Sequence, residues 1–301
     1  MGVNRGLGVG VARPARRARA APRASRRRRM AVLAALAVAA AAVALIVVRT
    51  PAAVATRGAQ IVRFTIDSPL VHQTMPVTAV IPAGSGGERR PLLVFLHGKG
   101  GDQNSSLSSQ LFAALASLGA RAPDVVFPYG GADSYWHDRA DGAWGSYVYT
   151  EVIPQAISRL HADPSAVAIG GVSMGGFGAL DIARLHPGRF CAVGGHSAAL
   201  WVSGGDSAPG AFDDAEDFAR NDIIGAARTG DPYRGMAVWL DAGTLDPFRA
   251  ADTTLAGELR ADGQAVQFHI WPGSHEISYW DSHWGDYLRF YAAALAGCHR
   301  G

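Results

Sequence analysis

The sequence predicts an α/β protein with a mostly parallel central sheet flanked by helices. Short apolar runs, among them 91–96, 166–169 and 236–241, alternate with longer segments of helical spacing. This alternation continues without a break from about Ile61 to the end of the chain. Such continuity favours one large domain over two small ones, and we expect a single folded domain at 60–301.

The individual elements follow from the same pattern. Two leading strands of antiparallel type are expected at 61–66 and 77–81. Apolar runs predict further strands at 91–96, 124–127, 166–169, 190–193, 236–241 and 265–271. Helical spacing predicts helices at 105–118, 146–160, 177–186, 248–259 and 279–295. Pro154 is expected to kink the second of these helices.

The segment 201–234 is the least regular part of the chain, and we expect a small cap or pocket-wall insertion there. It contains an acidic run at 213–217, Asp-Asp-Ala-Glu-Asp. The run lacks the pattern of a calcium loop. A solvated face is therefore the interpretation we favour for it.

The first 30 residues differ in charge from the rest of the chain. Residues 1–30 carry ten arginines and no acidic residue, while the net charge of the whole chain is +3. Residues 31–301 therefore carry 3 − 10 = −7. The basic character belongs to an arginine-rich cytoplasmic segment, and it does not indicate that the folded domain binds nucleic acid.

An uninterrupted apolar run of eighteen residues follows at 31–48. Behind a positive segment such a run is typical of an export signal, so we expect a secreted or extracytoplasmic domain. The run is long enough to anchor the chain in a membrane, but nine of its residues are alanine. We favour cleavage after Ala55, within a linker at 49–59, and keep membrane attachment as the alternative.

Ser173 is the most informative residue of the sequence. It lies in the segment 171–175, Gly-Val-Ser-Met-Gly, between an apolar run and a segment of helical spacing. This is the strand–turn–helix context of a G-x-S-x-G nucleophile elbow. Small flanking residues are needed there because the serine backbone is strained and the strand and helix pack closely. The motif predicts that Ser173 is a nucleophile.

A glycine-rich loop at 97–101, His-Gly-Lys-Gly-Gly, follows the strand expected at 91–96. Loops of this kind supply one backbone N–H to an oxyanion hole, and the residue after the nucleophile supplies the other. We expect Lys99 to be the first donor, with Gly100 as the alternative, and Met174 to be the second. The Lys99 ammonium is expected to lie in solvent.

The acid and the base follow the serine in the order that this fold requires. Asp246 lies in the loop after the strand 236–241, and His275 lies in the loop after the last strand. An acid so placed can orient the imidazole, and the imidazole can reach the serine. The alternative acid is Asp241, at the end of its strand. The alternative base, His283, falls in an expected helix.

Four segments carry a resemblance to a known family: 97–101, 171–176, 241–246 and 273–280. Together they resemble the esterase D type of α/β-hydrolase, which includes carboxylesterases, feruloyl esterases, S-formylglutathione hydrolases and mycolyltransferases. The resemblance covers about residues 60–298. It implies an α/β-hydrolase fold and a triad of Ser173, Asp246 and His275. The sequence departs from the family at Ile277, where an aromatic residue is common, so the shape of the acyl pocket differs.

Several aromatic residues cluster around the expected loops. They pack in the core on one interpretation, and form an aromatic acyl or sugar platform beside Ser173 on the other. The substrate-binding candidates are Trp136, Trp201, His196 and Trp280.

The two cysteines, Cys191 and Cys298, would be compatible with one disulfide in an exported protein. The sequence leaves that pairing open, because a disulfide depends on geometry. Neither cysteine has a nearby partner at metal-ligand spacing. We expect no metal and no cofactor.

These observations predict an exported serine carboxylesterase that acts on a small-molecule or cell-envelope ester through an acyl-enzyme. An acyltransferase that passes the acyl group to a sugar or lipid hydroxyl would have the same triad, and is the first alternative. The second is a non-catalytic surface-binding protein on a hydrolase scaffold. The complete set of Ser173, Asp246 and His275 argues against the second alternative.

Overall fold

The computed structural model describes residues 54–84 and 89–298. The arginine-rich segment 1–30, the apolar run 31–48 and the first part of the expected linker, 49–53, lie outside the described residues. The described residues belong to one compact unit. None of the helices in this part of the chain is long and apolar enough to cross a membrane.

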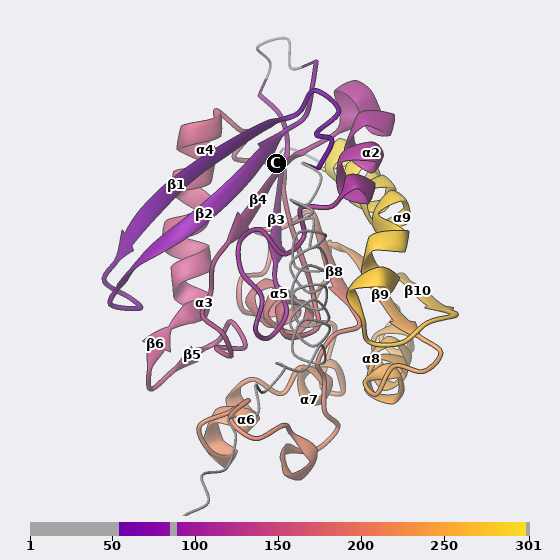
Figure 1. The fold of residues 1–301 in the computed structure, drawn as a ribbon. Helices are drawn as coiled ribbons and strands as arrows, with labels where there is room; N and C mark the ends of the chain where they lie inside the picture. Colours follow the sequence, from indigo (N-terminus) through magenta and orange to yellow (C-terminus); the bar gives the residue numbers. More distant parts are fainter. Residues whose placement is uncertain (1–53, 85–88, 299–301) are drawn as a thin grey trace, which may run out of the picture. The chain divides into compact units, whose positions relative to one another are not determined.

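An eight-stranded sheet forms the centre of the molecule (Figure 1). Its spatial order is β1-β2-β4-β3-β7-β8-β9-β10. β1 pairs antiparallel with β2, and β2 pairs antiparallel with β4, whereas the other neighbours are parallel. The strands are β1 (Gln60–Ser68), β2 (Gln73–Ile81), β3 (Leu92–Leu96), β4 (Asp124–Pro128), β7 (Val167–Val172), β8 (Ala192–His196), β9 (Ala237–Gly243) and β10 (Val266–Trp271). The predicted mostly parallel sheet is confirmed.

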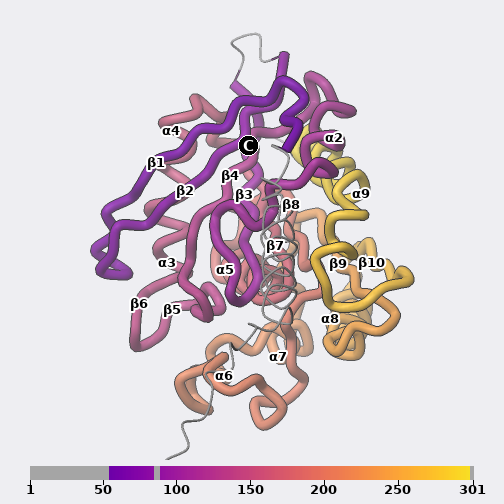
Figure 2. Tube along the Cα trace, in the orientation of Figure 1, coloured from indigo at the N-terminus to yellow at the C-terminus, as the bar shows by residue number. Residues whose placement is uncertain are grey.

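Helices cover both faces of the sheet because its central strands are apolar on both sides. On β3, Leu92, Val94 and Leu96 point into one core, while Leu93 and Phe95 point into the other. The second core contains the helices α2 (Ser109–Leu118) and α9 (Ile277–Ala296), which lie together on one side in Figures 1 and 2. The first core contains α4 (Ile153–Leu160), α5 (Met174–Leu185), α7 (Ile223–Ala227) and α8 (Arg249–Ala261).

The helix expected at 146–160 is built from three pieces. A short helix α3 (Trp144–Tyr147) leads into a π-helical turn, η2 (Val148–Val152), and then into α4. Pro154 lies in the first turn of α4, where a missing N–H is tolerated. The helix therefore has a widened, π-helical turn just before the proline, in place of the simple kink expected at Pro154.

The insertion at 201–234 contains a single 3₁₀ turn (Gly204–Asp206), α6 (Ala215–Arg220) and α7. It contacts a small hairpin, β5 (Asp138–Arg139) and β6 (Gly142–Ala143). The sequence did not predict this hairpin. Arg139 binds the Asp213 carboxylate at 2.7 Å, and His137 binds that of Asp217 at 3.0 Å. Asp217 is fully buried, so the expectation of a solvated face is wrong for this residue. Its burial is compensated by hydrogen bonds from His137 and Asn221.

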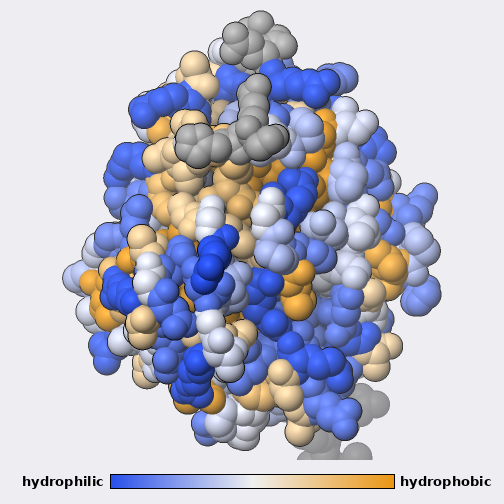
Figure 3. Space-filling model, turned by 180° about the vertical axis from the view of Figure 1, so that it is seen from behind, coloured by the Kyte–Doolittle hydropathy of each residue, from blue (hydrophilic) through white to orange (hydrophobic). Residues whose placement is uncertain are grey.

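A disulfide joins Cys191, which precedes β8, to Cys298 after α9, with the two Cα atoms 5.6 Å apart. The pairing that the sequence left open is thus formed in the structure. Outside the cores, the large apolar side chains that are exposed lie scattered along the described chain: Val54, Leu185, Val202, Leu245, Ile270 and Ile277. The face seen in Figure 3 accordingly mixes hydrophilic and hydrophobic residues.

Candidate active site

Ser173 lies at a sharp turn between β7 and α5, as the motif predicted. Its backbone adopts φ 55° and ψ −118°, a conformation that is costly for a residue with a side chain. The turn is tight because Gly171 packs on the backbone of Gly175, and Gly175 packs on the carbonyl of Leu96. A β-carbon at either glycine would overlap these backbone atoms. The glycines thus allow the strained turn, which presents the Ser173 hydroxyl at the carboxyl edge of the sheet.

A continuous chain of hydrogen bonds links Ser173, His275 and Asp246. The Ser173 hydroxyl lies 2.8 Å from Nε2 of His275, and Nδ1 of the same imidazole lies 2.9 Å from the Asp246 carboxylate. The Asp246 side chain is fully buried, while that of His275 is 22% exposed. His275 is therefore accessible from the cavity, and Asp246 is shielded behind it.

The carboxyl group of Asp246 is stabilised as an anion. Burial alone would raise its pKa, but hydrogen bonds from His275 and from the Phe248 backbone N–H outweigh burial and lower the pKa below its ordinary value. An ionised Asp246 accepts a hydrogen bond from the Nδ1–H of His275, so that the unprotonated Nε2 faces Ser173.

Asp241, the alternative acid, makes different contacts. It is fully buried at the end of β9, and His196 donates to it at 2.7 Å. The other donors to its carboxylate are Trp239 Nε1, Tyr279 OH and Tyr287 OH. His283, the alternative base, bonds the Tyr279 carbonyl on its own helix and stacks on Trp271. Neither alternative contacts the serine.

The predicted oxyanion loop lies beside the serine. Gly98 is close enough that a β-carbon on it would stand 3.3 Å from Cβ of Ser173. The N–H of Gly100 donates to the Ala132 carbonyl at 2.7 Å, so the expectation that Gly100 could be a donor is wrong. Among the described residues, no acceptor binds the N–H of Lys99. Met174 is the first residue of α5, where backbone N–H groups have no partner within the helix.

His97 holds the oxyanion loop in shape. Its Nε2 accepts from the Gly130 N–H at 3.1 Å, so Nδ1 carries the proton and donates to the Gly98 carbonyl at 2.9 Å. Burial lowers the pKa of His97, which favours this neutral form. The carbonyl of His97 in turn accepts from Nε1 of Trp136.

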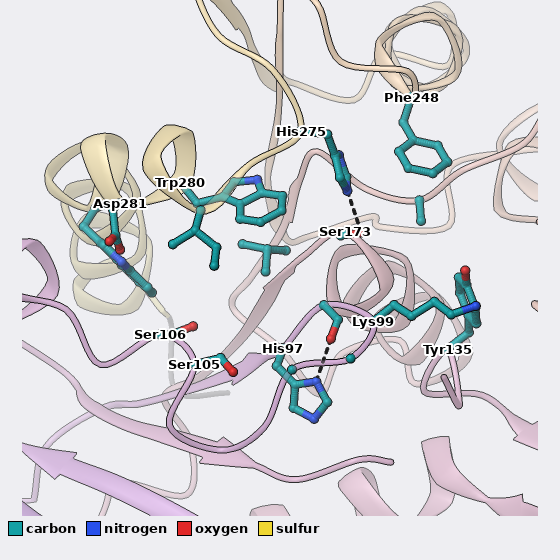
Figure 4. Close-up of a pocket in the computed structure, with 17 residues that line it drawn as sticks. His97, Lys99, Ser105, Ser106, Tyr135, Ser173, Phe248, His275, Trp280 and Asp281 are labelled. Carbon is teal, nitrogen blue, oxygen red and sulfur yellow. Dashed lines mark hydrogen bonds between the residues drawn. The ribbon is translucent and has the colours of Figure 1, made fainter. Parts of the chain in front are cut away.

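A cavity of about 550 Å³ opens above Ser173. In Figure 4, Lys99, Tyr135 and Phe248 lie on one side of Ser173, and Trp280 and Asp281 lie on the other. The Lys99 ammonium lies 5.9 Å from the centre of the Tyr135 ring. We had expected this ammonium to lie in solvent, and the sequence did not predict its aromatic neighbour.

Of the four substrate-binding candidates, one lines the cavity and three do not. Trp280 lines the cavity. Trp136 and His196 are fully buried and do not line it, so both expectations are wrong. The Trp136 indole fills the space that Gly130 and Gly178 leave open. Trp201 does not line the cavity either, but it packs behind two residues that do, with ring centres 5.7 Å from Tyr135 and 5.6 Å from Phe248.

Sequence reasoning missed several residues of the cavity wall. Tyr135 and Phe248 lie in loops, where no periodicity marks a side chain as facing a site. Asp281 and Trp284 lie on α9 with Ile277 and Trp280, which the sequence analysis had named, and the spacing of the four could have revealed a shared face. Among the described residues, no group of three or more His, Cys, Asp or Glu side chains could hold a metal ion.

A family model described as putative esterase matches residues 68–290. The chain belongs to this esterase family. Its membership agrees with the resemblance to esterases that the motifs indicated, and ester hydrolysis is the activity class that the family name gives.

Curated proteins with similar sequences come from mycobacteria. Esterase Rv1288 of Mycobacterium tuberculosis is 28% identical over 232 residues, covering 64% of this chain and 50% of that protein. The MPT51 antigen of Mycobacterium leprae is 32% identical over 93 residues, covering 30% of this chain and 31% of that protein. The chain therefore spans half or less of the length of these relatives.

Solved structures of esterases share the fold. A ferulic acid esterase superimposes with a TM-score of 0.69 at 22% identity, covering 78% of this chain and 99% of that chain. An S-formylglutathione hydrolase from Agrobacterium tumefaciens gives a TM-score of 0.67 at 19% identity, covering 79% of this chain and 96% of that chain. The predicted α/β-hydrolase fold is thus confirmed.

Proposed function

We propose that this protein is an exported serine carboxylesterase that hydrolyses esters through an acyl-enzyme. The observation that carries the proposal is the unbroken hydrogen-bond chain from Asp246 through His275 to Ser173, at the floor of an open cavity. This arrangement supplies a nucleophile, a base within reach of its proton, and an acid that orients the base.

The reaction begins when Nε2 of His275 takes the proton of the Ser173 hydroxyl, from which it is 2.8 Å distant. The serine oxygen attacks the ester carbonyl, and the ionised Asp246 stabilises the imidazolium that forms. His275 then gives its proton to the leaving alcohol. In the second half a water molecule, deprotonated by His275, attacks the acyl-serine, and the serine recovers its proton.

Two backbone N–H groups are available for the negative oxygen of the tetrahedral intermediate. The N–H of Lys99 has no acceptor among the described residues, and that of Met174 is at the helix N-terminus. One such donor contributes roughly 3–4 kcal/mol to the stabilisation of the transition state. The helix dipole of α5 adds to this, because the N-terminal end of a helix favours negative charge.

A fluorophosphonate probe tests the proposal directly. We expect it to label the wild-type protein covalently at Ser173 and to abolish hydrolysis of 4-nitrophenyl esters. The variant Ser173→Ala should take no label, while its thermal melt stays close to wild type. A wild-type protein that is folded but neither labels nor hydrolyses any ester of a chain-length series would overturn the enzymatic assignment and favour a non-catalytic binding protein.

An acyltransferase is the second candidate. The cavity extends to both sides of Ser173 (Figure 4), which leaves room for an acceptor beside the acyl group. The chemistry is unchanged except that a sugar or lipid hydroxyl replaces water. Hydrolysis in the presence of sugar acceptors, with product analysis by mass spectrometry, separates the two: an acylated sugar as main product would favour transfer.

Export is part of the proposal. The arginine-rich segment 1–30 and the apolar run 31–48 support it, as does the disulfide between Cys191 and Cys298, because disulfides persist in oxidising compartments. Cell fractionation and N-terminal sequencing test it. A mature chain that begins at Thr56 indicates cleavage, and an intact, detergent-extractable chain indicates membrane attachment. An intact chain in the soluble cytoplasmic fraction would contradict export.

A further inference from the structure

One face of α9 forms a wall of the cavity. Ile277, Trp280, Asp281 and Trp284 all line it. Their positions are i, i+3, i+4 and i+7, which a helix places along a single stripe. Three of these side chains are apolar or aromatic, and Asp281 is the exception.

The Asp281 carboxylate is half-buried, yet within the described residues it makes no ion pair and no hydrogen bond. An acidic residue on a helix ordinarily faces solvent or pairs with a basic neighbour, as Asp286 does with Arg289 on the same helix. Removing a carboxylate from water without a partner is unfavourable. The unpaired Asp281 carboxylate on the cavity wall is therefore available to a partner that the substrate brings.

The surroundings of Asp281 favour a cation as that partner. Within 54–84 and 89–298 no arginine lines the cavity, and the Lys99 ammonium lies on the other side of Ser173 (Figure 4). Trp280 lines the same wall, as does Trp284, of which only 2% is exposed. Aromatic faces attract cations, and a carboxylate adds direct charge attraction in a partly desolvated site. The net charge of −7 over residues 31–301 acts in the same direction.

We propose that the Asp281 side of the cavity binds a cationic group of the substrate, an ammonium or quaternary ammonium carried by the ester. This inference rests on the proposed ester hydrolysis and names a substrate class for it. Asp281 is a specificity-determining residue here, because it lines the same cavity as Ser173 and takes no part in the bond changes. Trp280, which is partly exposed, forms the aromatic part of the same subsite.

Two pairs of isosteric esters test the inference. The first pair is acetylcholine and the neutral 3,3-dimethylbutyl acetate, in which the charge of the cationic ester is on the alcohol part. The 4-nitrophenyl esters of 4-(trimethylammonio)butanoic acid and 5,5-dimethylhexanoic acid place it on the acyl group. Each pair differs only in N⁺ against C. We expect a ratio of kcat/KM, cationic over neutral, of about tenfold in one pair, because that is the size of a charge and cation–π contact in a partly desolvated site.

The variant Asp281→Asn should bring this ratio close to one, because it keeps the shape and removes the charge. Asp286→Asn is the matched control, since it removes the same charge from the same helix outside the cavity. Its ratio should remain that of the wild type. Added salt should shrink the wild-type ratio, as expected for a half-exposed charge.

The outcomes separate this inference from the proposed function. A wild-type protein that hydrolyses the neutral esters without preferring a cationic ester in either pair would overturn the cationic subsite alone. An equal ratio in wild type and Asp281→Asn, or an equal loss in Asp286→Asn, would overturn it as well. Absence of hydrolysis for every neutral and cationic ester would instead refute the proposed esterase.

Discussion

Asp241 lies in β9 and Asp246 in the loop after it, yet their carboxylates bind different histidines. Asp246 binds Nδ1 of His275 at 2.9 Å, and Asp241 binds Nδ1 of His196 at 2.7 Å. The first pair faces the cavity through His275, whereas the second is fully buried. The same type of contact therefore occurs twice, once at the site of chemistry and once in the core.

Substitution of the two aspartates should separate these roles. Asp246→Asn should reduce kcat by ~10³–10⁴-fold with a nearly unchanged melting temperature, because the amide favours the wrong tautomer of His275. Asp241→Asn should lower the melting temperature by at least about 5 °C, because it leaves buried donors without an acceptor. Kinetics and thermal melts of both variants check this. The acid would have to be reassigned if Asp241→Asn stopped turnover without affecting the melt.

The nucleophile and the base should act as one unit. Ser173→Ala and His275→Ala should each lower kcat by ~10⁴–10⁶-fold, and the double variant should lose little more, because either change removes the same step. His283→Ala is the control, since His283 bonds the Tyr279 carbonyl and not the serine. Single-turnover kinetics on a 4-nitrophenyl ester measure the loss. Equal damage from His283→Ala in a folded protein would contradict the assignment of the base.

Two glycines offer a matched pair of alanine substitutions. At Gly175 a β-carbon would overlap the Leu96 carbonyl, so Gly175→Ala should prevent the elbow from closing and abolish labelling by a fluorophosphonate. At Gly257, inside α8, a β-carbon would meet no atom within 4 Å. Gly257→Ala should therefore stabilise the protein by about 0.5–1 kcal/mol through helix propensity alone. Urea unfolding compares the two, and normal activity in Gly175→Ala would disprove the close approach.

The disulfide should contribute measurably to stability. It closes a loop with a sequence separation of 107, and cross-links of such length stabilise by about 2–4 kcal/mol through the unfolded chain. Cys298→Ser should lower the free energy of unfolding by this amount, and a reducing agent should have the same effect on the wild type but none on the variant. Identical melts of oxidised and reduced wild type would show that the bond contributes nothing.

Stability should decrease from acidic to weakly alkaline pH. Burial raises the pKa of Asp252 well above its ordinary value, with Asp246 and Asp241 raising it further, and burial raises those of Asp124 and Asp181 to about 6. The folded state holds these protons more tightly than the unfolded state. Their contribution to the free energy of unfolding is therefore full below pH ~4, and it is lost as the pH rises through the pKa values of the folded state. These three groups should make the melting temperature fall between pH 5 and pH 8, while His97, whose pKa burial lowers, acts in the opposite direction.

Asp252→Asn should flatten this pH dependence, because the amide cannot ionise at any pH. Its melting temperature should exceed that of the wild type at pH 8 and approach it at pH 5. The exposed Asp262, which follows the same helix, provides the control, and Asp262→Asn should leave the profile unchanged. A steeper profile in Asp252→Asn would reverse the sign of the argument.

The elements of the candidate active site could be predicted because each depends on local sequence. Ser173 lies in a five-residue motif, and Asp246 and His275 lie in loops that follow strands at the same edge of the sheet. Chain order and strand position were sufficient to bring them together. The same reasoning located Lys99 beside the serine, since its loop follows a buried strand.

The surroundings of the site depend on packing between distant segments, and there the sequence was a poorer guide. Trp136 was placed in the pocket, but its indole occupies the space beside Gly130 and Gly178. His196 was placed in the pocket too, but its partners, Asp241 and Tyr291, are 45 and 95 residues away. No local pattern distinguishes an aromatic ring on a cavity wall from one behind it.

The hydrogen bonds between the insertion at 201–234 and the region of the hairpin β5–β6 have a consequence for lipid substrates. His137–Asp217 and Arg139–Asp213 fix the segment whose Trp201 supports Tyr135 and Phe248. A lipase whose lid swings open at an oil–water boundary needs a loosely held cover, whereas this segment is held by a buried hydrogen bond and an exposed ion pair. The enzyme should therefore turn over dispersed and micellar esters at similar rates, with no jump in velocity at the critical micelle concentration.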